Sequence, residues 1–195
     1  MALKNYFWDS CVFISYLNND DAVDIKSLRA FIADLDKPNG CRIYTSAIAL
    51  AEVSPKRLVN TAVGTFQDFL KDFKGTIQVV DAGPYENQTA GLLKDIAYKR
   101  NGSNKRVLTT GDAIMLATAL ELEDTYGVKI DAFHTYDNGR GKGNPEGRGV
   151  PLLDYHLWLD GVADHELAAR VVKMNRCRPA HGNPDLFANA NPKSI

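Results

Sequence analysis

Cysteine is scarce in this chain, and its three residues, Cys11, Cys41 and Cys177, lie far apart. An odd number of cysteines at wide spacing gives neither a disulfide framework nor the close pairs of a zinc site. Disulfides are also rare in the reducing cytoplasm. We therefore expect a cytoplasmic protein.

Long apolar runs and an excess of charge of one sign are missing as well. No stretch approaches the ~20 apolar residues that a membrane-spanning helix needs, so we expect no membrane contact. Strand-like residues follow directly after Met1-Ala2-Leu3-Lys4, so we expect no signal peptide. The formal net charge of −1 excludes nucleic-acid binding through a uniformly basic surface, but it allows a basic patch beside an acidic site.

The residues that are present form an alternating pattern. Of 195 residues, 45% are hydrophobic and 24% charged, which suits a globular domain with a core of its own. Apolar runs typical of buried strands occur over 5–8, 41–45, 76–81, 130–135 and 150–153. Helical spacing of apolar residues occurs over 11–17, 25–35, 59–73, from 85 to about 100, 112–122 and about 164–176. This alternation predicts a parallel sheet with helices on both faces.

Four acidic residues occupy places that such a sheet brings to its carboxyl edge. Asp9 follows the first strand and Asp137 follows the strand at 130–135, whereas Glu52 and Asp112 lie on helices that follow strands. Carboxylates about 4 Å apart repel by ~1 kcal/mol per pair in water and ~4 kcal/mol at a protein surface. Either these groups are spread apart and solvated, or a divalent cation neutralises them. Alone, Asp9 could be a helix N-cap and Asp112 an ordinary acid at a helix start.

The type of ligand in this set predicts the cation. Hard oxygen ligands without convergent Cys or His select Mg²⁺, or Mn²⁺, over zinc. Such an ion lowers the pKa of a bound water and polarises a phosphoryl group. Hydrolysis of a phosphodiester is the reaction that this chemistry serves best.

Four segments resemble, in order, the four motifs of PIN-domain nucleases, and the nearest likeness is to the VapC-type toxins of bacterial toxin–antitoxin systems. The segments are Tyr6-Phe7-Trp8-Asp9-Ser10, Thr45-Ser46-Ala47-Ile48-Ala49-Leu50-Ala51-Glu52-Val53, Asp112-Ala113-Ile114-Met115-Leu116-Ala117-Thr118-Ala119 and Phe133-His134-Thr135-Tyr136-Asp137. The resemblance implies a three-layer α/β/α sandwich with a central, mostly parallel sheet. We expect a nuclease domain over residues 1–154. Residues 155–195 are expected to form a C-terminal helix and an extended tail packed on or beside that domain.

The resemblance also implies an activity and partners. The activity is that of a Mg²⁺- or Mn²⁺-dependent endoribonuclease, in which metal-activated water hydrolyses RNA. The expected partners are RNA, a small antitoxin protein and a second copy of the chain in a homodimer. The catalytic and metal-binding quartet would be Asp9, Glu52, Asp112 and Asp137, with the hydroxyls of Ser10 and Thr135 in support.

The chain departs from the family after Asp137, where Asn138 begins a glycine-rich stretch over 139–149 instead of a hydrophobic one. Its basic residues, Arg140, Lys142 and Arg148, suit RNA phosphates, although a solvated linker is the alternative. Lys105 and Arg106 raise the same question. For the whole chain, the alternative is a catalytically inactive PIN-like module that binds RNA or protein.

Overall fold

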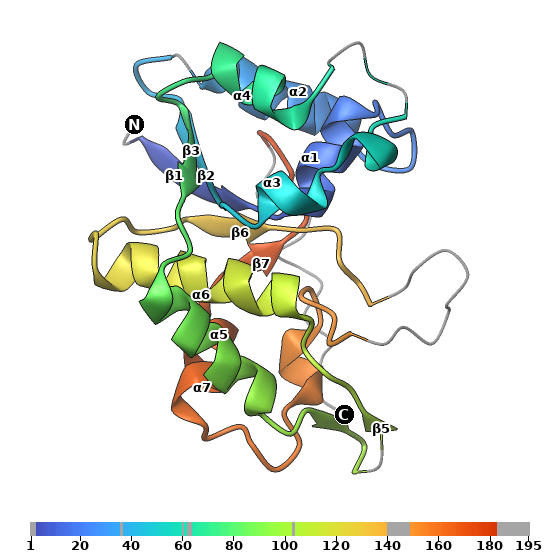
Figure 1. Cartoon of the computed structure of the whole chain (residues 1–195), viewed down its shortest axis with the longest axis vertical. Coiled ribbons are helices and arrows are strands. Elements are labelled where there is room, and N and C mark those ends of the chain that lie inside the picture. The colour runs from blue at the N-terminus through green and yellow to red at the C-terminus, as the bar shows by residue number, and fades with distance from the viewer. Residues whose placement is uncertain are drawn as a thin grey trace.

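Five parallel strands form the central sheet of this α/β protein, and helices cover both of its faces (Figure 1). The computed structural model describes residues 3–35, 37–59, 61, 64–102, 104–139 and 149–182. The strands are β1 (Lys4–Trp8), β2 (Cys41–Ser46), β3 (Ile77–Val80), β6 (Ala132–His134) and β7 (Arg176–Cys177). They lie in the order β3-β2-β1-β6-β7, and each pairing is parallel. The predicted three-layer α/β/α sandwich is therefore confirmed.

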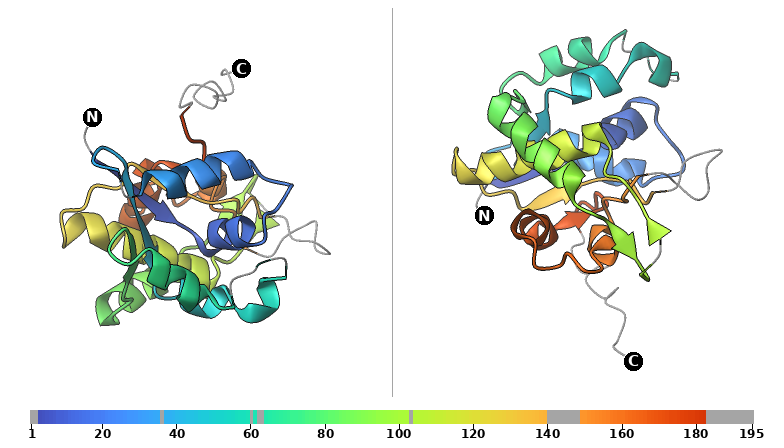
Figure 2. Two further views of the ribbon diagram at one scale, coloured as in Figure 1. Left: turned by 90° about the horizontal axis from the view of Figure 1, so that it is seen from above. Right: turned by 60° about the horizontal axis from the view of Figure 1, so that its bottom comes forward.

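The helices divide between the two faces of the sheet. The helices are α1 (Ser10–Leu17), α2 (Ile25–Asp34), α3 (Ala49–Glu52), α4 (Phe66–Asp72), α5 (Pro84–Asp95), α6 (Thr110–Asp124) and α7 (Glu166–Lys173). Figures 1 and 2 show α1, α2 and α4 on one side of the sheet and α5, α6 and α7 on the other. Two 3-10 helices, η1 (Pro55–Arg57) and η2 (Tyr155–Trp158), and an antiparallel hairpin, β4 (Lys99–Arg100) with β5 (Asn104–Lys105), complete the described structure. Among the helices of these residues, none combines the length and the apolar character needed to cross a membrane.

Alternate residues of β1 pack against opposite layers. The ring of Trp8 lies 5.2 Å from that of Phe13 in α1 and 6.1 Å from that of Phe31 in α2. Phe7 points to the other face of the sheet and stacks on Phe133 of β6 at 5.1 Å. Both Phe7 and Trp8 are fully buried, as expected for a parallel sheet covered on both faces. This packing fixes β1 at the centre of the sheet, with its carboxyl end beneath the candidate site.

The strand predicted over 150–153 is wrong, and the fifth strand comes later in the chain. Val150 and Leu152 are buried, but their segment forms no strand in the described structure. Instead, the amide of Leu152 donates to the carboxylate of Asp137 at 3.0 Å. The fifth strand is β7, which pairs with β6 on the side away from β1 and lies where a helix was predicted to run on to Arg176. A strand of two residues is too short to show a period in the sequence.

Two helices are shorter than predicted. The helix predicted over 59–73 begins only at Phe66, because the hydroxyl of Thr65 accepts the amide hydrogen of Asp68 and caps it there. Val59 lies outside this helix and is 72% exposed. The helix predicted to reach about residue 100 ends at Asp95, because the backbone turns extended at Ile96 and then enters β4.

Residues after Asp154 share the core of the sheet. Tyr155, Trp158 and Val171 belong to the same buried cluster as the strands, and the hydroxyl of Tyr155 lies 2.9 Å from that of Tyr98. The helix expected in this segment is α7. Residues 183–195 of the expected tail lie outside the described residues.

Candidate functional site

Asp9 stands directly after β1, at the carboxyl edge of the sheet, and is only 5% exposed. It occupies the N-cap position of α1, but its carboxylate makes no capping hydrogen bond. The carboxylate oxygen Oδ2 accepts hydrogen bonds from the hydroxyl of Thr135 at 2.7 Å and from the thiol of Cys11 at 3.0 Å. The side chain of Asp9 is therefore held by its neighbours at the edge and does not serve as a helix cap.

Glu52 reaches the same edge from α3. The hydroxyl of Ser10 donates to its Oε2 at 2.5 Å, which joins α3 to the start of α1. The other carboxylate oxygen, Oε1, lies against the backbone of Gly111, where a Cβ atom would be only 2.0 Å away. Glycine at position 111 thus allows the Glu52 carboxylate to approach the N-terminus of α6.

Asp112 lies in the first turn of α6, next to the N-cap residue Thr109. The hydroxyl of Thr109 accepts the amide hydrogen of Asp112 at 3.2 Å and donates to its Oδ2 at 2.5 Å. These reciprocal bonds fix both the start of the helix and the direction of the carboxylate. The local sequence Thr-x-x-Asp is sufficient to produce this arrangement.

Asp137 is held by backbone amides. Its Oδ1 accepts from the amide of Gly139 at 2.8 Å, and its Oδ2 accepts from the amide of Leu152 at 3.0 Å. Its own amide donates to the Thr135 hydroxyl at 2.9 Å, while that hydroxyl donates to Asp9. Thr135 thus connects the two aspartates that follow β1 and β6.

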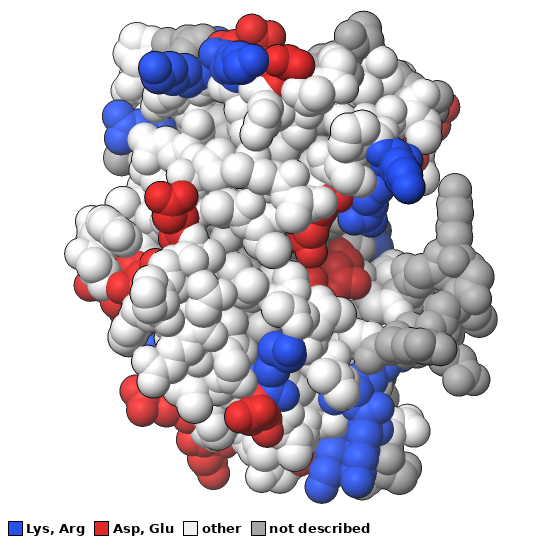
Figure 3. Space-filling view, in the orientation of Figure 1, with Lys and Arg blue, Asp and Glu red and all other residues white. Residues whose placement is uncertain are grey.

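The four carboxylates influence one another electrostatically. The pKa of Asp112 is raised to about 7: burial is the largest cause, the hydrogen bond from Thr109 opposes it, and the negative charges of Asp9, Asp137 and Glu52 add to the rise. Burial also raises the pKa of Asp9, with Glu52 and Asp137 adding to the shift, whereas the bonds from Cys11 and Thr135 lower it. Figure 3 shows acidic side chains gathered in a recess on this face, where α3 approaches the beginning of α6. We refer to Asp9, Glu52, Asp112 and Asp137 as the acidic cluster.

The acidic cluster matches a hard divalent cation in charge and in donor type. Within the described part of the chain, no three Asp, Glu, His or Cys side chains are grouped as a ready-made site for an ion. The match therefore rests on the oxygen donors and on the cost of ionising Asp9 and Asp112 beside their neighbours. Cys11 is not a thiolate donor, because burial and the nearby Asp9 raise the pKa of its thiol well above the usual value.

The structure brings together six of the predicted site residues and leaves three undescribed. Asp9, Ser10, Glu52, Asp112, Thr135 and Asp137 meet at one edge of the sheet. Arg140, Lys142 and Arg148 lie outside the described residues. Three further residues contact the acidic cluster and are not among the predicted site residues, namely Cys11, Thr109 and Gly111. The motif Thr-x-x-Asp could have pointed to Thr109, but the contact of Gly111 with Glu52 has no local signature.

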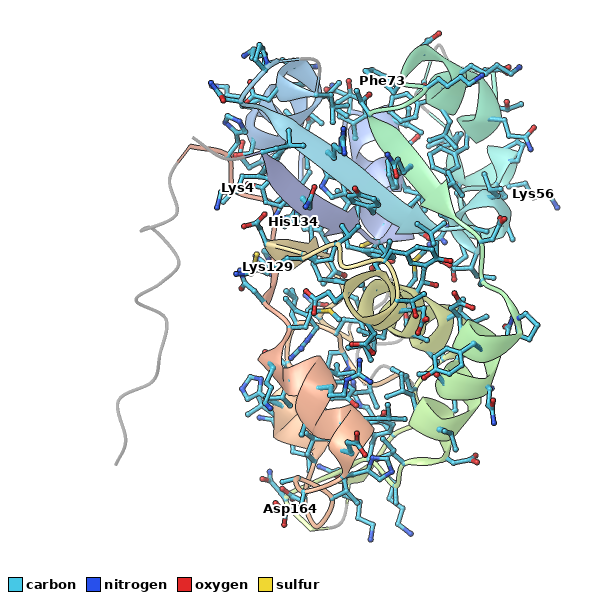
Figure 4. The ribbon with its side chains drawn as sticks, turned by 90° about the vertical axis from the view of Figure 1, so that its left-hand side faces the viewer. Lys4, Lys56, Phe73, Lys129, His134 and Asp164 are labelled. Carbon is cyan, nitrogen blue, oxygen red and sulfur yellow. The ribbon has the colours of Figure 1, made fainter. Side chains whose placement is uncertain are left out.

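His134 belongs to the core beneath the site. Its ring stacks on that of Tyr6 at 4.8 Å and lies 5.0 Å from that of Phe31, and only 2% of the residue is exposed. Figure 4 shows His134 on β6 at the centre of the molecule. Burial lowers its pKa to about 3. The imidazole is therefore neutral, and it packs as an aromatic group.

Comparisons of the sequence with models of known protein families and with curated proteins give no match.

Proposed function

We propose that the chain is a Mg²⁺- or Mn²⁺-dependent endoribonuclease of the PIN-domain type. The observation that carries this proposal is the meeting of Asp9, Glu52, Asp112 and Asp137 at one edge of a parallel sheet. These four residues come from four separate segments of the chain. The negative charges of the other three raise the pKa of Asp112. Since like charges destabilise the fold, a cluster of this kind is expected where function requires it.

The chain supplies the support that such a site needs. Asp9, Glu52, Asp112 and Asp137 would hold the cation, which when bound polarises a phosphate and lowers the pKa of a water. Thr135 orients Asp9, Ser10 orients Glu52 and Thr109 orients Asp112. Ligands whose own positions are fixed by hydrogen bonds lose little freedom when they bind.

The substrate in this proposal is single-stranded or looped RNA. Water adds to the phosphorus atom, the bond from phosphorus to the 3′ oxygen breaks, and that oxygen leaves with a proton. The products carry a 5′-phosphate and a 3′-hydroxyl. These ends distinguish the reaction from attack by the ribose 2′-hydroxyl, which would leave a phosphate on the 3′ side.

A small antitoxin protein is the proposed regulator, and its support is the resemblance to VapC-type toxins. Two apolar side chains close to Glu52 in the sequence suit contact with a protein, since Leu50 is 41% exposed and Val59 is 72% exposed. We expect a companion protein to be encoded beside this chain. Adding that protein should suppress cleavage. We also propose that two copies of the chain form a homodimer, again on the basis of the resemblance to VapC-type toxins.

The proposed activity is tested by comparing RNA cleavage among variants in which a carboxylate at the carboxyl edge of the sheet is replaced by an amide. We expect Asp9→Asn and Asp112→Asn to lower cleavage of labelled RNA in Mn²⁺ buffer by at least about a hundredfold, and a chelator to do the same to the unmodified protein. Asp81→Asn is the matched control, because Asp81 also follows a strand at this edge but is exposed. Undiminished cleavage by Asp9→Asn and Asp112→Asn would refute the nuclease assignment. RNA binding without cleavage in any divalent metal would favour the inactive module.

A further inference from the structure

A pocket of about 430 Å³ is lined by Asn138, which directly follows Asp137, and three of its other lining residues are arginines. The cations are Arg100, Arg106 and Arg178, and we call this site the arginine pocket. Among the described lining residues, the only carboxylate is that of Asp154, so the cations outnumber it by three to one. Such a surplus of guanidinium groups is typical of a site for anions.

Four separate segments of the chain form this pocket, namely 100–106, Asn138, 151–158 and Arg178. Arg178 directly follows β7, which is parallel to β6, so Arg178 stands at the same carboxyl edge as Asp137. Arg100 comes from the β4–β5 hairpin, which lies beside η2 (Figure 2). Two hydrogen bonds hold this hairpin, one from the amide of Asp160 to the carbonyl of Lys99 at 3.2 Å and one from the amide of Gly102 to the Asp160 carboxylate at 3.0 Å.

Arg106 lines the arginine pocket and also contacts Gly149, a neighbour of the acidic cluster. Its guanidinium lies 4.3 Å over the ring of Trp158 and donates to the carbonyl of Gly149 at 3.0 Å. Gly149 also approaches the acidic cluster, because a Cβ atom there would lie 4.0 Å from Oδ2 of Asp112. Asn138 lines the pocket and directly follows Asp137. The two sites therefore share both Gly149 and the chain around Asp137 as neighbours.

The two sites carry opposite charges, and a polynucleotide would interact with both. The acidic cluster is negative and the arginine pocket is positive. Figure 3 shows basic side chains gathered over the β4–β5 hairpin, apart from the acidic recess. Carboxylates repel the phosphates of an approaching strand, and the repulsion is strong where water is partly excluded. A neighbouring set of guanidinium groups offsets it, because arginine binds phosphate oxygens in pairs.

We infer that the arginine pocket binds a backbone phosphate of the RNA strand whose neighbouring linkage lies at the acidic cluster, with Arg100 and Arg178 as the phosphate contacts. This inference rests on the proposed function. The shared chemistry is a phosphate group, and a free nucleotide would offer it as well as a strand.

The test measures binding without cleavage, so that it does not depend on the activity. A fluorescent single-stranded RNA of about 12 nucleotides is titrated with the whole protein in a chelator, and its anisotropy is followed. We expect Arg100→Ala with Arg178→Ala to weaken binding on the order of tenfold for each arginine lost. The slope of log affinity against log salt should become shallower by about 0.7 for each phosphate contact removed.

Two control variants sharpen this measurement. Arg42→Ala removes an exposed arginine on β2, away from the carboxyl edge, and should leave both the affinity and the salt slope unchanged. Arg100→Lys with Arg178→Lys keeps the charge and should restore part of the affinity and the full salt slope. Thermal melts should show that all these variants are folded.

The outcomes separate this inference from the proposed function. Binding lost only in the Arg100 and Arg178 variants supports the pocket, even if no metal supports cleavage by the unmodified protein. Unchanged affinity and salt slope in Arg100→Ala with Arg178→Ala would overturn the pocket, even if the protein cleaves RNA. Failure of the unmodified protein to bind the RNA would overturn it as well. A 5′-mononucleotide that competes at the concentration of the oligonucleotide would reassign the pocket to free nucleotides and overturn the strand contact.

Discussion

The same four-residue motif, Thr-x-x-Asp, begins two helices of this protein in opposite electrostatic settings. At α4, the hydroxyl of Thr65 accepts the amide hydrogen of Asp68 and donates to its carboxylate at 2.7 Å. At α6, Thr109 makes the same two bonds with Asp112. Hydrogen bonds from Lys71 and Thr65 lower the pKa of Asp68, whereas burial and three neighbouring carboxylates raise that of Asp112 to about 7.

This difference teaches that the helix cap and the chemistry of its carboxylate are determined separately. The cap is local, since it depends on residues three apart in sequence. The charge state depends on what the rest of the fold brings to the carboxylate. At α4 that neighbour is the cation Lys71, and at α6 it is the acidic cluster.

The largest effect on stability near neutral pH is expected from Asp112→Asn. The pKa of Asp112 is about 7 in the folded protein, whereas its ordinary value is 3.8. The carboxyl group of Asp112 therefore binds a proton more tightly in the folded state than in the unfolded state. The unmodified protein should therefore lose stability as the pH rises from about 4 to 7, on the order of 4 kcal/mol. Asp112→Asn should remove that loss and be the more stable protein at about pH 8. Urea denaturation of both proteins across this pH range measures the difference.

The control for this prediction is Asp68→Asn, at the corresponding position of α4. The pKa of Asp68 is lowered, so the charged form is favoured in the folded protein and Asp68→Asn should not stabilise it at any pH. Mn²⁺ should raise the melting temperature of the unmodified protein and of Asp68→Asn, but not that of Asp112→Asn. A stability for Asp112→Asn at or below that of the unmodified protein near pH 8 would contradict the strain assigned to the acidic cluster.

His134 provides an effect of similar total size at acid pH, with the opposite slope. Burial lowers its pKa to about 3 from the ordinary 6.5, so the folded protein resists protonation. Its contribution is fully present above about pH 6.5 and is lost as the pH falls toward 3, by roughly 1.4 kcal/mol per pH unit. His134→Phe, which keeps an aromatic ring beside Tyr6 and Phe31, should flatten this part of the pH profile. An unchanged slope in that variant would mean that folding does not lower the pKa of His134.

Gly111→Ala should affect activity more than stability. An added Cβ atom would meet Oε1 of Glu52 at 2.0 Å, and the flexible end of that side chain would have to move. We expect cleavage to fall on the order of tenfold, because ligands must keep their geometry within about 0.5 Å. The free energy of unfolding should be unchanged or slightly higher, since alanine favours a helix over glycine. Gln67→Ala alters the corresponding position of α4 and should leave cleavage intact, and equal activity of both variants would remove the role given to Gly111.

The parts of the fold that follow local rules could be predicted from the sequence. Strand runs and helical spacing gave the parallel sheet, and the carboxyl ends of its strands placed Asp9 and Asp137. The expected carboxylate–hydroxyl contacts also involve neighbours of those strand ends, such as Ser10 and Thr135.

The parts that depend on long-range packing could not be predicted. The strand β7 has two residues and exists only because β6 offers it a pairing edge. Without β7, nothing in the sequence places Arg178 beside Asp137 and hence in the arginine pocket. The contact of Gly111 with Glu52 likewise joins segments that the sequence keeps far apart.

The smallest effect is expected when each cap is removed in turn, and it tests the comparison most directly. Thr65→Ala and Thr109→Ala each lose an N-cap and should each destabilise the protein by about 1 kcal/mol. The Thr109 hydroxyl also lowers the pKa of Asp112, so its loss should raise that pKa further. The acidic limb of the pH profile for RNA cleavage should then move to higher pH in Thr109→Ala and stay in place in Thr65→Ala. Equal destabilisation with the same pH profile in both variants would show that Thr109 is a cap and nothing more, and that Asp112 is not part of the reacting centre.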